Sequence, residues 1–340
     1  MRTHRISGII LCLVLGTLVN AAGPGLRVTK KIPLGGEGGW DYLTVDSGAK
    51  RLYVSHATHV EVVDLVTEKV VGDIPGTEGV HGITLATELN RGFISCGKAD
   101  KAVIFDLKTL KPIGEVKTGA NPDAILYDPA SKRVFTFNGR GKDATAFEAS
   151  TGKVIGTIPM GGKPEFAAAD GKGKIYVNVE NTSEVVELDS AKLTVTRRFP
   201  LKPGEEPSGM AFDAKRGLVF SGCGNKIMTV LDVKAGKVIA TIPIGDRVDG
   251  NGFDPETGMI FSANGDGTLT VAREASPGKF EVVETVATQK GARTIAVDTA
   301  THRAYLPTAE FGPAPAATAE NPRPRPAVLK DTFVILVVGK

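Results

Sequence analysis

Cysteine is scarce in this chain, and several familiar catalytic signatures are missing from it. Only 3 of the 340 residues are Cys. Cys12 lies in an N-terminal apolar run, while Cys96 and Cys223 fall in the second and fifth of the repeats described below, so we expect buried thiols and no disulfide. The motifs Gly-x-Ser-x-Gly, His-Glu-x-x-His and Cys-x-x-Cys-His are absent. Their absence argues against an α/β-hydrolase, a zincin and a covalently bound haem.

An excess of charge of either sign is also absent. The chain has 41 basic and 38 acidic residues, and removing residues 1–22 takes away two Arg and no acid, which leaves a net charge of +1. A nearly neutral protein attracts a polyanion only through a local basic patch, and the sequence shows no such cluster. We therefore expect no nucleic-acid partner, and we expect a monomer.

Long apolar runs are confined to the N-terminus. Residues 9–19 are mainly apolar, Arg2 and Arg5 precede them, and the small residues Ala21 and Ala22 follow. This pattern is typical of a signal peptide, because the run is too short for a stable transmembrane helix. We predict that residues 1–22 are removed on export, that the mature protein is periplasmic or secreted, and that residues 23–340 contain no membrane span.

A repeat of about forty residues organises the rest of the chain. Its marker is an aromatic residue in a short β-rich segment, and successive markers are 40, 42, 41, 44, 41 and 44 residues apart. The seven markers are Tyr53, Phe93, Phe135, Tyr176, Phe220, Phe261 and Tyr305. Repeats of this length, rich in strands and turns, are typical of β-propellers. We predict an all-β protein, a seven-bladed β-propeller of four-stranded antiparallel blades, over residues 23–340.

Turns and edge strands repeat along with the aromatic markers. An Asp precedes five of the markers by seven residues, which predicts hairpin turns in which the carboxylate accepts backbone hydrogen bonds. Ile-Pro pairs at Pro75, Pro159 and Pro243 suit outer edge strands, because proline cannot donate to a ladder. A further pair, Ile32-Pro33, precedes the first repeat, whereas the last repeat lacks a fourth strand. We therefore predict that residues 26–34 supply the outer strand of the last blade and close the ring.

These features resemble the YVTN family of bacterial β-propeller repeats. The closest copies are Tyr53-Val54-Ser55, Tyr176-Val177-Asn178 and the stretch 237–245, whose sequence is Lys-Val-Ile-Ala-Thr-Ile-Pro-Ile-Gly. The resemblance covers roughly residues 26–340, with Phe replacing Tyr in four repeats. It implies a propeller fold but no particular activity, because such propellers include binding proteins, surface proteins and enzymes.

One face of the predicted ring collects polar residues. Loops that lead into the innermost strands lie on this face together with loops that join the second and third strands, and the former should bring side chains to the mouth of the central channel. Converging ionisable groups in a concavity are typical of a ligand site. The predicted ligand-binding residues are Asp41, His56, His81, Asp123, Glu165, Asp249, Asn251 and Arg293. His302 is expected in a turn on the opposite face, with no role in the site.

Several functions fit such a mouth. A divalent metal ion is a candidate cofactor, with His81, Asp123 and Glu165 as its ligands, and it could activate water. Alternatively, His81 could be a general base positioned by a carboxylate, with Asp123 and Arg293 as the other catalytic candidates. We expect a protein that binds a small molecule or a protein segment; a metal-assisted hydrolase or lactonase-like enzyme and a structural envelope protein are the alternatives.

A proline-rich segment interrupts the last repeat. Residues 311–326 contain five Pro together with alanines and two Arg, a composition that cannot form a ladder. We expect a surface loop on the face that carries the candidate site, where a lid or a partner contact is conceivable.

Overall fold

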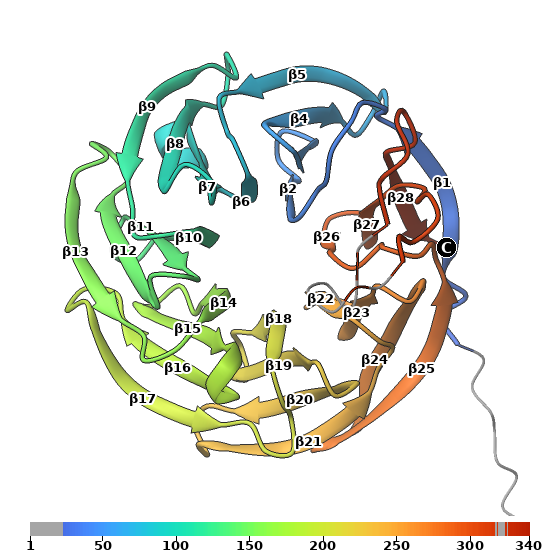
Figure 1. The fold of residues 1–340 in the computed structure, drawn as a ribbon. Coiled ribbons are helices and arrows are strands. Elements are labelled where there is room, and N and C mark those ends of the chain that lie inside the picture. Colours follow the sequence, from blue (N-terminus) through green and yellow to red (C-terminus); the bar gives the residue numbers. More distant parts are fainter. Residues whose placement is uncertain (1–22, 317, 319–323, 325) are drawn as a thin grey trace, which may run out of the picture.

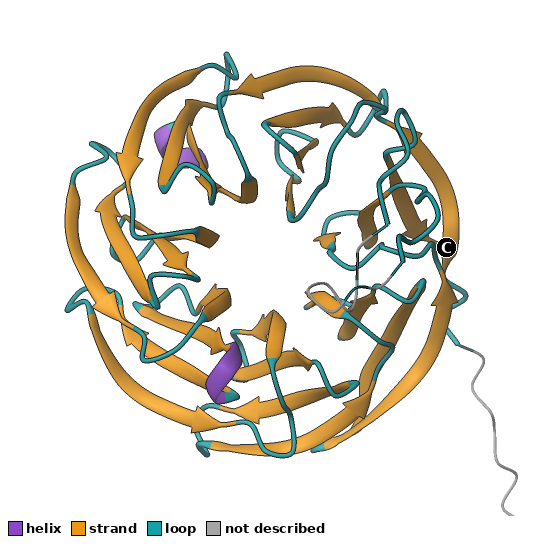
Figure 2. Ribbon diagram, viewed as in Figure 1, coloured by secondary structure: helices purple, strands orange, loops and turns teal. Residues whose placement is uncertain are grey.

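Seven small antiparallel sheets are arranged in a ring around a central channel (Figure 1). The structure is a computed structural model, and it describes residues 23–316, 318, 324 and 326–340. Each sheet has four strands, and we call these sheets blades 1 to 7. Within the described residues, helix is limited to the short 3-10 turns η1 (Thr87–Leu89) and η2 (Glu180–Thr182), as Figure 2 shows. The predicted seven-bladed propeller is confirmed.

In the first four blades the strands follow one another from the channel to the rim. Blade 1 contains β2 (Leu43–Asp46), β3 (Arg51–His56), β4 (His59–Asp64) and β5 (Lys69–Pro75). Blade 2 contains β6 (Val80–Ala86), β7 (Arg91–Cys96), β8 (Lys101–Asp106) and β9 (Pro112–Lys117). Blade 3 contains β10 (Pro122–Asp128), β11 (Arg133–Asn138), β12 (Asp143–Glu148) and β13 (Val154–Pro159). Blade 4 contains β14 (Pro164–Ala169), β15 (Lys174–Val179), β16 (Glu184–Asp189) and β17 (Thr194–Pro200).

Blades 5 and 6 follow the same order, whereas the last blade combines the two ends of the chain. Blade 5 contains β18 (Pro207–Asp213), β19 (Leu218–Cys223), β20 (Ile227–Asp232) and β21 (Lys237–Pro243). Blade 6 contains β22 (Val248–Asp254), β23 (Met259–Asn264), β24 (Thr268–Ser276) and β25 (Lys279–Ala287). Blade 7 contains β26 (Ala296–Asp298), β27 (Arg303–Thr308), β28 (Val334–Gly339) and, as its outer strand, β1 (Arg27–Pro33). The pairing of β1 with β28 confirms that the N-terminal strand closes the ring.

The repeated aromatic residues form the core between neighbouring blades. All seven markers lie in second strands and are at most 4% exposed. Tyr53 of blade 1 contacts Phe105 of blade 2 with ring centroids 5.7 Å apart, and Phe93 of blade 2 contacts Phe147 of blade 3 at 5.8 Å. Each blade thus buries its faces against its neighbours, which is how a chain of this length avoids needing one large core.

The other repeated features also have structural roles. In the outer strands the Ile of each Ile-Pro pair is buried, whereas its Pro is exposed at the strand end. Cys96 and Cys223 are free and buried, and burial raises the pKa of these thiols to about 12 and about 11. Such thiols are poor nucleophiles at neutral pH. Among the described residues, no helix is long and apolar enough to span a membrane.

Candidate functional site

A ring of seven side chains surrounds one mouth of the channel. These residues occupy the same place in each blade, at or just before the start of the innermost strand, and are 40, 42, 42, 43, 41 and 44 residues apart. We call them the mouth ring: Asp41, His81, Asp123, Glu165, Ser208, Asp249 and Arg293. Six of its members are among the predicted ligand-binding residues. The repeat itself brings them together, because each first strand enters the channel from the same face.

His81 joins the two acids that flank it. Its Nδ1 donates to Asp41 Oδ2 at 2.6 Å and lies 3.6 Å from Asp123 Oδ1. The backbone of Asp41 is fixed from two sides, since its N–H donates to Ser55 Oγ at 2.8 Å and its carbonyl accepts from Thr294 Oγ1 at 2.6 Å. The three side chains are therefore held in a defined arrangement across blades 1 to 3.

Arg293 connects the acids on the other side of the mouth ring. Its guanidinium is 3.2 Å from Asp249 Oδ2 and 3.8 Å from Asp41 Oδ1. Asp249 also accepts a hydrogen bond of 2.6 Å from Ser208 Oγ. An almost continuous chain of polar contacts thus runs from Ser208 through Asp249, Arg293, Asp41 and His81 to Asp123.

Glu165 has a cation of its own. Lys163, two residues earlier, places its ammonium 2.5 Å from Glu165 and 2.5 Å from Glu180. Only 9% of the Glu165 side chain is exposed, whereas 43% of the Lys163 side chain is. Water therefore screens Lys163 more than Glu165.

Burial and crowding shift the pKa values of these groups. Burial lowers the pKa of His81, but its hydrogen bond with Asp41 and the neighbouring carboxylates outweigh this effect and raise it to about 9. Burial and the charge of Asp41 raise the pKa of Asp123 to about 7. Burial and the charge of Asp123 raise the pKa of Glu165 to about 8, against the opposing effect of Lys163. The mouth ring therefore has more carboxyl groups than its own cations neutralise.

Two aromatic side chains meet directly inside the mouth ring. Tyr42 follows Asp41 and Phe166 follows Glu165, so both lie one residue deeper in the channel. They come from blades 1 and 4, and their ring centroids are 4.9 Å apart in an edge-to-face arrangement. Tyr42 is 6% exposed, and burial, together with the acids of the mouth ring, raises the pKa of its hydroxyl. The mouth ring is therefore a polar rim above an aromatic floor.

The channel wall has a different character away from the mouth ring. A cavity of about 380 Å³ is lined mostly by small and apolar residues, including Leu126, Ala167, Met210 and Val297. These groups offer no charge to a ligand. The polar chemistry of the channel is thus concentrated at the mouth ring.

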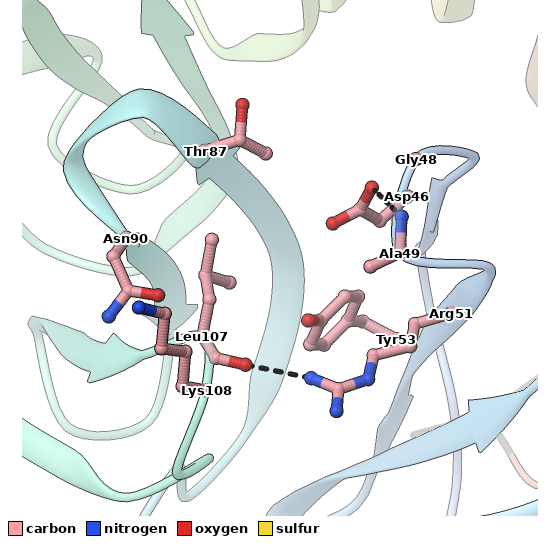
Figure 3. Close-up of a pocket in the computed structure, with 9 residues that line it drawn as sticks. All are labelled: Asp46, Gly48, Ala49, Arg51, Tyr53, Thr87, Asn90, Leu107 and Lys108. Carbon is pink, nitrogen blue, oxygen red and sulfur yellow. Dashed lines mark hydrogen bonds between the residues drawn. The ribbon is translucent and has the colours of Figure 1, made fainter.

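A second cavity, of about 730 Å³, lies on the opposite face between the turns of blades 1 and 2 (Figure 3). Its polar groups take part in the turns themselves: Asp46 accepts from the backbone N–H of Ala49 at 2.9 Å, and Arg51 donates to the carbonyl of Leu107 at 2.7 Å. We assign these contacts to blade structure. His302 is on this face too, where its Nδ1 is 2.7 Å from Asp254 Oδ2.

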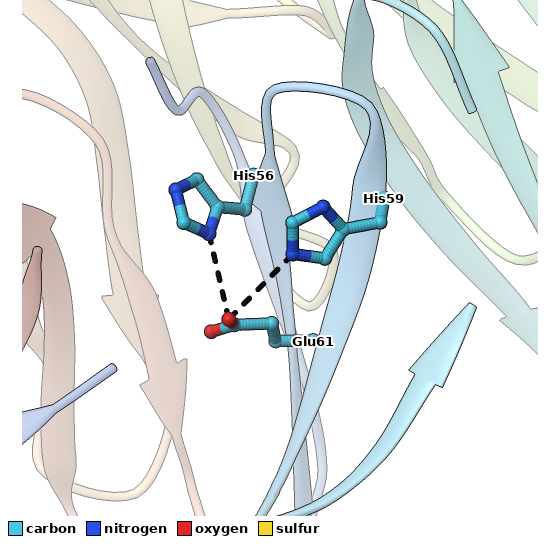
Figure 4. A group of neighbouring side chains, drawn as sticks. All are labelled: His56, His59 and Glu61. Carbon is cyan, nitrogen blue, oxygen red and sulfur yellow. Dashed lines mark hydrogen bonds and ion pairs between the residues drawn. The ribbon is translucent and has the colours of Figure 1, made fainter. Parts of the chain in front are cut away.

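Two of the predicted ligand-binding residues lie outside the mouth ring. His56 is 1% exposed and belongs to a separate cluster with His59 and Glu61 (Figure 4). Asn251 is buried, and its amide donates to the carbonyls of Gly209 and Phe220 at 3.3 and 3.1 Å, so it joins blades 5 and 6. His56 ends β3, whereas Asn251 lies in the middle of β22, and the side chains of both are directed into the blades.

The side chains grouped around His81 differ by one residue from the predicted metal ligands. His81 and Asp123 have Asp41 as their third neighbour, and the ligand atoms of these three residues lie within 4.8 Å of one another. Glu165 interacts electrostatically with Asp123 but forms its short contact with Lys163. Lys163, two positions before Glu165, thus provides that carboxylate with an ammonium partner.

Fold and site together define a seven-bladed β-propeller with a polar, acid-rich channel mouth. The chain matches no model of a known protein family and no curated protein. Among solved structures, it is similar to hydrazine synthase of Kuenenia stuttgartiensis, with 15% identity and a TM-score of 0.72 over 79% of this chain and 92% of that one. In all, 1731 chains of solved structures match. At this identity the likeness shows the fold alone, and so widely shared a fold does not specify a function.

Proposed function

We propose that this protein is an exported YVTN-type propeller that binds a small, positively charged ligand at the mouth ring. Export is supported by the signal-peptide pattern of residues 1–22, which lie outside the described residues. The repeat motifs support the YVTN assignment, and the propeller fold is compatible with it.

The excess of acid in the mouth ring carries the proposal. Four of its seven side chains are carboxyls. His81 pairs with Asp41, Arg293 with Asp249 and the neighbouring Lys163 with Glu165, which leaves Asp123 without a cation of its own. The pKa of Asp123 is raised to about 7 because burial and Asp41 disfavour its charge. A bound cation would relieve that repulsion, so binding and ionisation of Asp123 favour each other.

The aromatic floor suits the same kind of ligand. The Tyr42–Phe166 pair lies directly below the carboxyls, and a primary amine or a metal ion at the rim would contact the acids first. Aromatic rings also attract cations through their π electrons. A lysine side chain of a partner segment would present the same ammonium group.

Thermal unfolding with added cations tests this function. We expect Ca²⁺ or putrescine to raise the melting temperature of residues 23–340, because a ligand that binds the folded state stabilises it. D123N should weaken the binding of the stabilising cation at least about tenfold, which corresponds to a loss of 1.4 kcal/mol of binding free energy. E256Q removes one charge from a side chain that is 74% exposed on the opposite face, and should leave binding unchanged. No stabilisation by Ca²⁺ or putrescine, or equal binding of the stabilising ligand by D123N, would contradict the proposal.

Metal-assisted hydrolysis is a second candidate, favoured by the grouping of Asp41, His81 and Asp123. One imidazole and two carboxylates are ligands that divalent transition metals accept, and a metal held there could activate water. We expect such an enzyme to contain one equivalent of metal that H81A loses together with lactone hydrolysis. Hydrolysis that survives both H81A and chelation would contradict this function.

A further inference from the structure

A row of potential metal ligands crosses one face of blade 1. His56 at the end of β3 is directly opposite His59 at the start of β4, and Glu61 of β4 is opposite Asp73 of β5. Residues two apart on a strand share a face, so His59 and Glu61 point to the same side, with their cross-strand neighbours His56 and Asp73. The two-residue turn at Ala57 and Thr58 thus brings two imidazoles and two carboxylates together.

The distances in this row suit a metal better than hydrogen bonds. Glu61 Oε1 is 3.4 Å from His56 Nδ1 and 3.6 Å from His59 Nε2, and His59 Nε2 is 3.7 Å from Asp73 Oδ1 (Figure 4 shows the first two). Hydrogen bonds from nitrogen to oxygen centre on about 2.9–3.0 Å. Tetrahedral zinc, with bonds of about 2.0–2.2 Å, sets its ligand atoms about 3.3–3.6 Å apart.

Equivalent positions in other blades show what a purely structural cluster looks like here. In blade 6 they hold Asn264, Thr268 and Thr270, and the Asn amide donates to both Thr hydroxyls at 3.1 Å. In blade 3, Asn138 likewise donates to Asp143 and Thr145 at 2.6 and 3.0 Å. Hydrogen bonds of ordinary length hold these clusters together. In the cluster of blade 1, each nitrogen-to-oxygen distance is longer than an ordinary hydrogen bond by about half an ångström or more.

Burial adds an independent observation. The His56 side chain is 1% exposed and packs against Phe333 with ring centroids 4.5 Å apart. Glu61 Oε2 and His56 Nε2 are buried without a hydrogen-bond partner among the described residues. Unsatisfied polar atoms at such a place are costly unless something else compensates them. A cation beside Glu61 would compensate the carboxylate.

From these observations we propose that blade 1 holds a zinc-type metal site. His56 Nδ1, His59 Nε2 and Glu61 are its ligands, and Asp73 or a water molecule completes the tetrahedron from the solvent side. The side chains of His59 and Asp73 are 28% and 57% exposed, which gives the ion a way in. Since all four residues come from β3, β4 and β5, this site is separate from the mouth ring and does not depend on the function proposed above.

Calorimetric titration of residues 23–340 with Zn²⁺ tests the site, and blade 6 supplies the matched control. The triple variant H56N/H59T/E61T copies the blade 6 cluster, so it should fold with its hydrogen bonds closed. We expect wild type to bind one more equivalent of Zn²⁺ than this variant, with H81A retaining that equivalent. E61Q, which keeps the size of the side chain, should weaken binding more than about 100-fold, because even second-shell changes cost 10–100-fold.

The outcomes separate this site from the mouth ring. Zn²⁺ bound equally by wild type and by the triple variant would overturn the proposal, as would the absence of saturable Zn²⁺ binding. If the triple variant does not fold, unchanged binding by E61Q overturns it in the same way. Co²⁺ gives a second readout, since tetrahedral coordination by two imidazoles should produce a visible absorption band in wild type and H81A but not in E61Q.

Discussion

His81 differs from the other members of the mouth ring because its charge is set by two neighbouring blades at once. Asp41 of blade 1 accepts its hydrogen bond at 2.6 Å, and Asp123 of blade 3 is 3.6 Å away. A histidine flanked by two carboxylates retains its proton well above pH 6.5. At neutral pH the mouth ring therefore contains an imidazolium, which is a poor general base but a good partner for carboxylates.

Replacing Asp41 with Asn should lower the pKa of His81 from about 9 towards its ordinary value, because the hydrogen bond with Asp41 is the largest contribution that raises it. The folded-state pKa lies above the unfolded one, so the stabilisation by protonated His81 is present below about pH 6.5 and is lost as the pH rises through 9. D41N should thus destabilise the protein at pH 6 and have less effect at pH 10. NMR titration of the histidine rings and urea unfolding at both pH values measure this, and an unchanged His81 pKa in D41N would contradict it.

Part of the site follows from the sequence because the repeat fixes the position of each residue. Asp41, His81, Asp123, Glu165, Asp249 and Arg293 all precede or begin a first strand, and the spacing of the aromatic markers is enough to align them. Side-chain direction is a different matter. The direction of His56 and Asn251 depends on strand pairing within their blades, which spacing does not give.

Two other contributors, Tyr42 and Phe166, have a sequence signal that emerges only after alignment of the repeats. The residue after each mouth-ring position is small or β-branched in the other five blades, namely Gly82, Ala124, Gly209, Gly250 and Thr294. Two aromatic residues at such a place are exceptional. Their contact across the channel depends on blades 1 and 4 being nearly opposite, which requires the closed ring. The sequence places Lys163 two positions before Glu165, as it places Arg247 before Asp249, but only the structure shows that Lys163 contacts Glu165.

Small residues at this position allow the first strands of adjacent blades to approach closely. A Cβ added to Gly209 would lie 2.7 Å from Gly250 Cα and 2.8 Å from Gly250 N. A Cβ on Gly250 would lie 2.9 Å from Ile295 N and from Thr294 Cα. These contacts are with backbone, which cannot rotate away as a side chain can. The innermost part of the ring is thus tightly packed strand against strand.

The substitution G209A should therefore destabilise the protein by about 1–3 kcal/mol, the usual cost of overpacking. Gly114 on β9 is the matched control, since a Cβ there would have its nearest neighbour, Ile104 Cδ1, at 3.8 Å. G114A should be neutral or slightly stabilising, because alanine restricts the unfolded chain. Urea unfolding of both variants measures the difference. Equal stability of G209A and G114A would show that the first strands have room to move apart.

Aspartate turns recur in several blades, and Asp254 shows how they act. Its carboxylate is 1% exposed and accepts from Thr257 Oγ1 at 2.8 Å and from the Glu256 N–H at 3.1 Å, and it faces His302 Nδ1 at 2.7 Å. Burial raises the pKa of Asp254, but hydrogen bonds from Thr257 and His302 outweigh it and hold the pKa below its ordinary value. The carboxylate therefore ties two strands of blade 6 to a turn of blade 7.

Because that pKa is lowered, the stability from Asp254 is present above its ordinary value near 4 and is lost as the pH falls through the folded value. D254N should cost about 1–3 kcal/mol at pH 7, the penalty for removing one partner of a buried hydrogen-bonded group. The variant should also show a weaker loss of stability on acidification than wild type. D298N, at the equivalent turn of blade 7, should behave alike. Urea unfolding between pH 3 and pH 7 measures both, and parallel curves for D254N and wild type would contradict the assignment.

At the scale of the whole molecule, the mouth ring depends on ring closure. Blades 7 and 1 meet where the two ends of the chain come together, and Arg293 of blade 7 is 3.8 Å from Asp41 of blade 1 across that junction. Thr294 also donates to the Asp41 carbonyl there, at 2.6 Å. Opening of the junction would separate Asp41 from Arg293 and so disturb the site. The terminal strand β1 thus has an indirect part in holding the mouth ring together.

The strength of the closure can be compared with that of an ordinary blade, because Ile32 of β1 and Ile158 of β13 occupy equivalent outer-strand positions and are both 2% exposed. If the ring unfolds as one cooperative unit, I32A and I158A should each cost about 2–5 kcal/mol, the range for truncating a buried Ile. Urea unfolding gives the two costs, and hydrogen exchange gives the protection of β1 and β13 amides. A much smaller cost for I32A, with β1 amides exchanging ahead of those of β13, would mean that blade 7 releases its outer strand while the other blades stay folded. Such local opening would loosen the Arg293–Asp41 contact first, so the affinity for a cation would then fall in I32A but not in I158A.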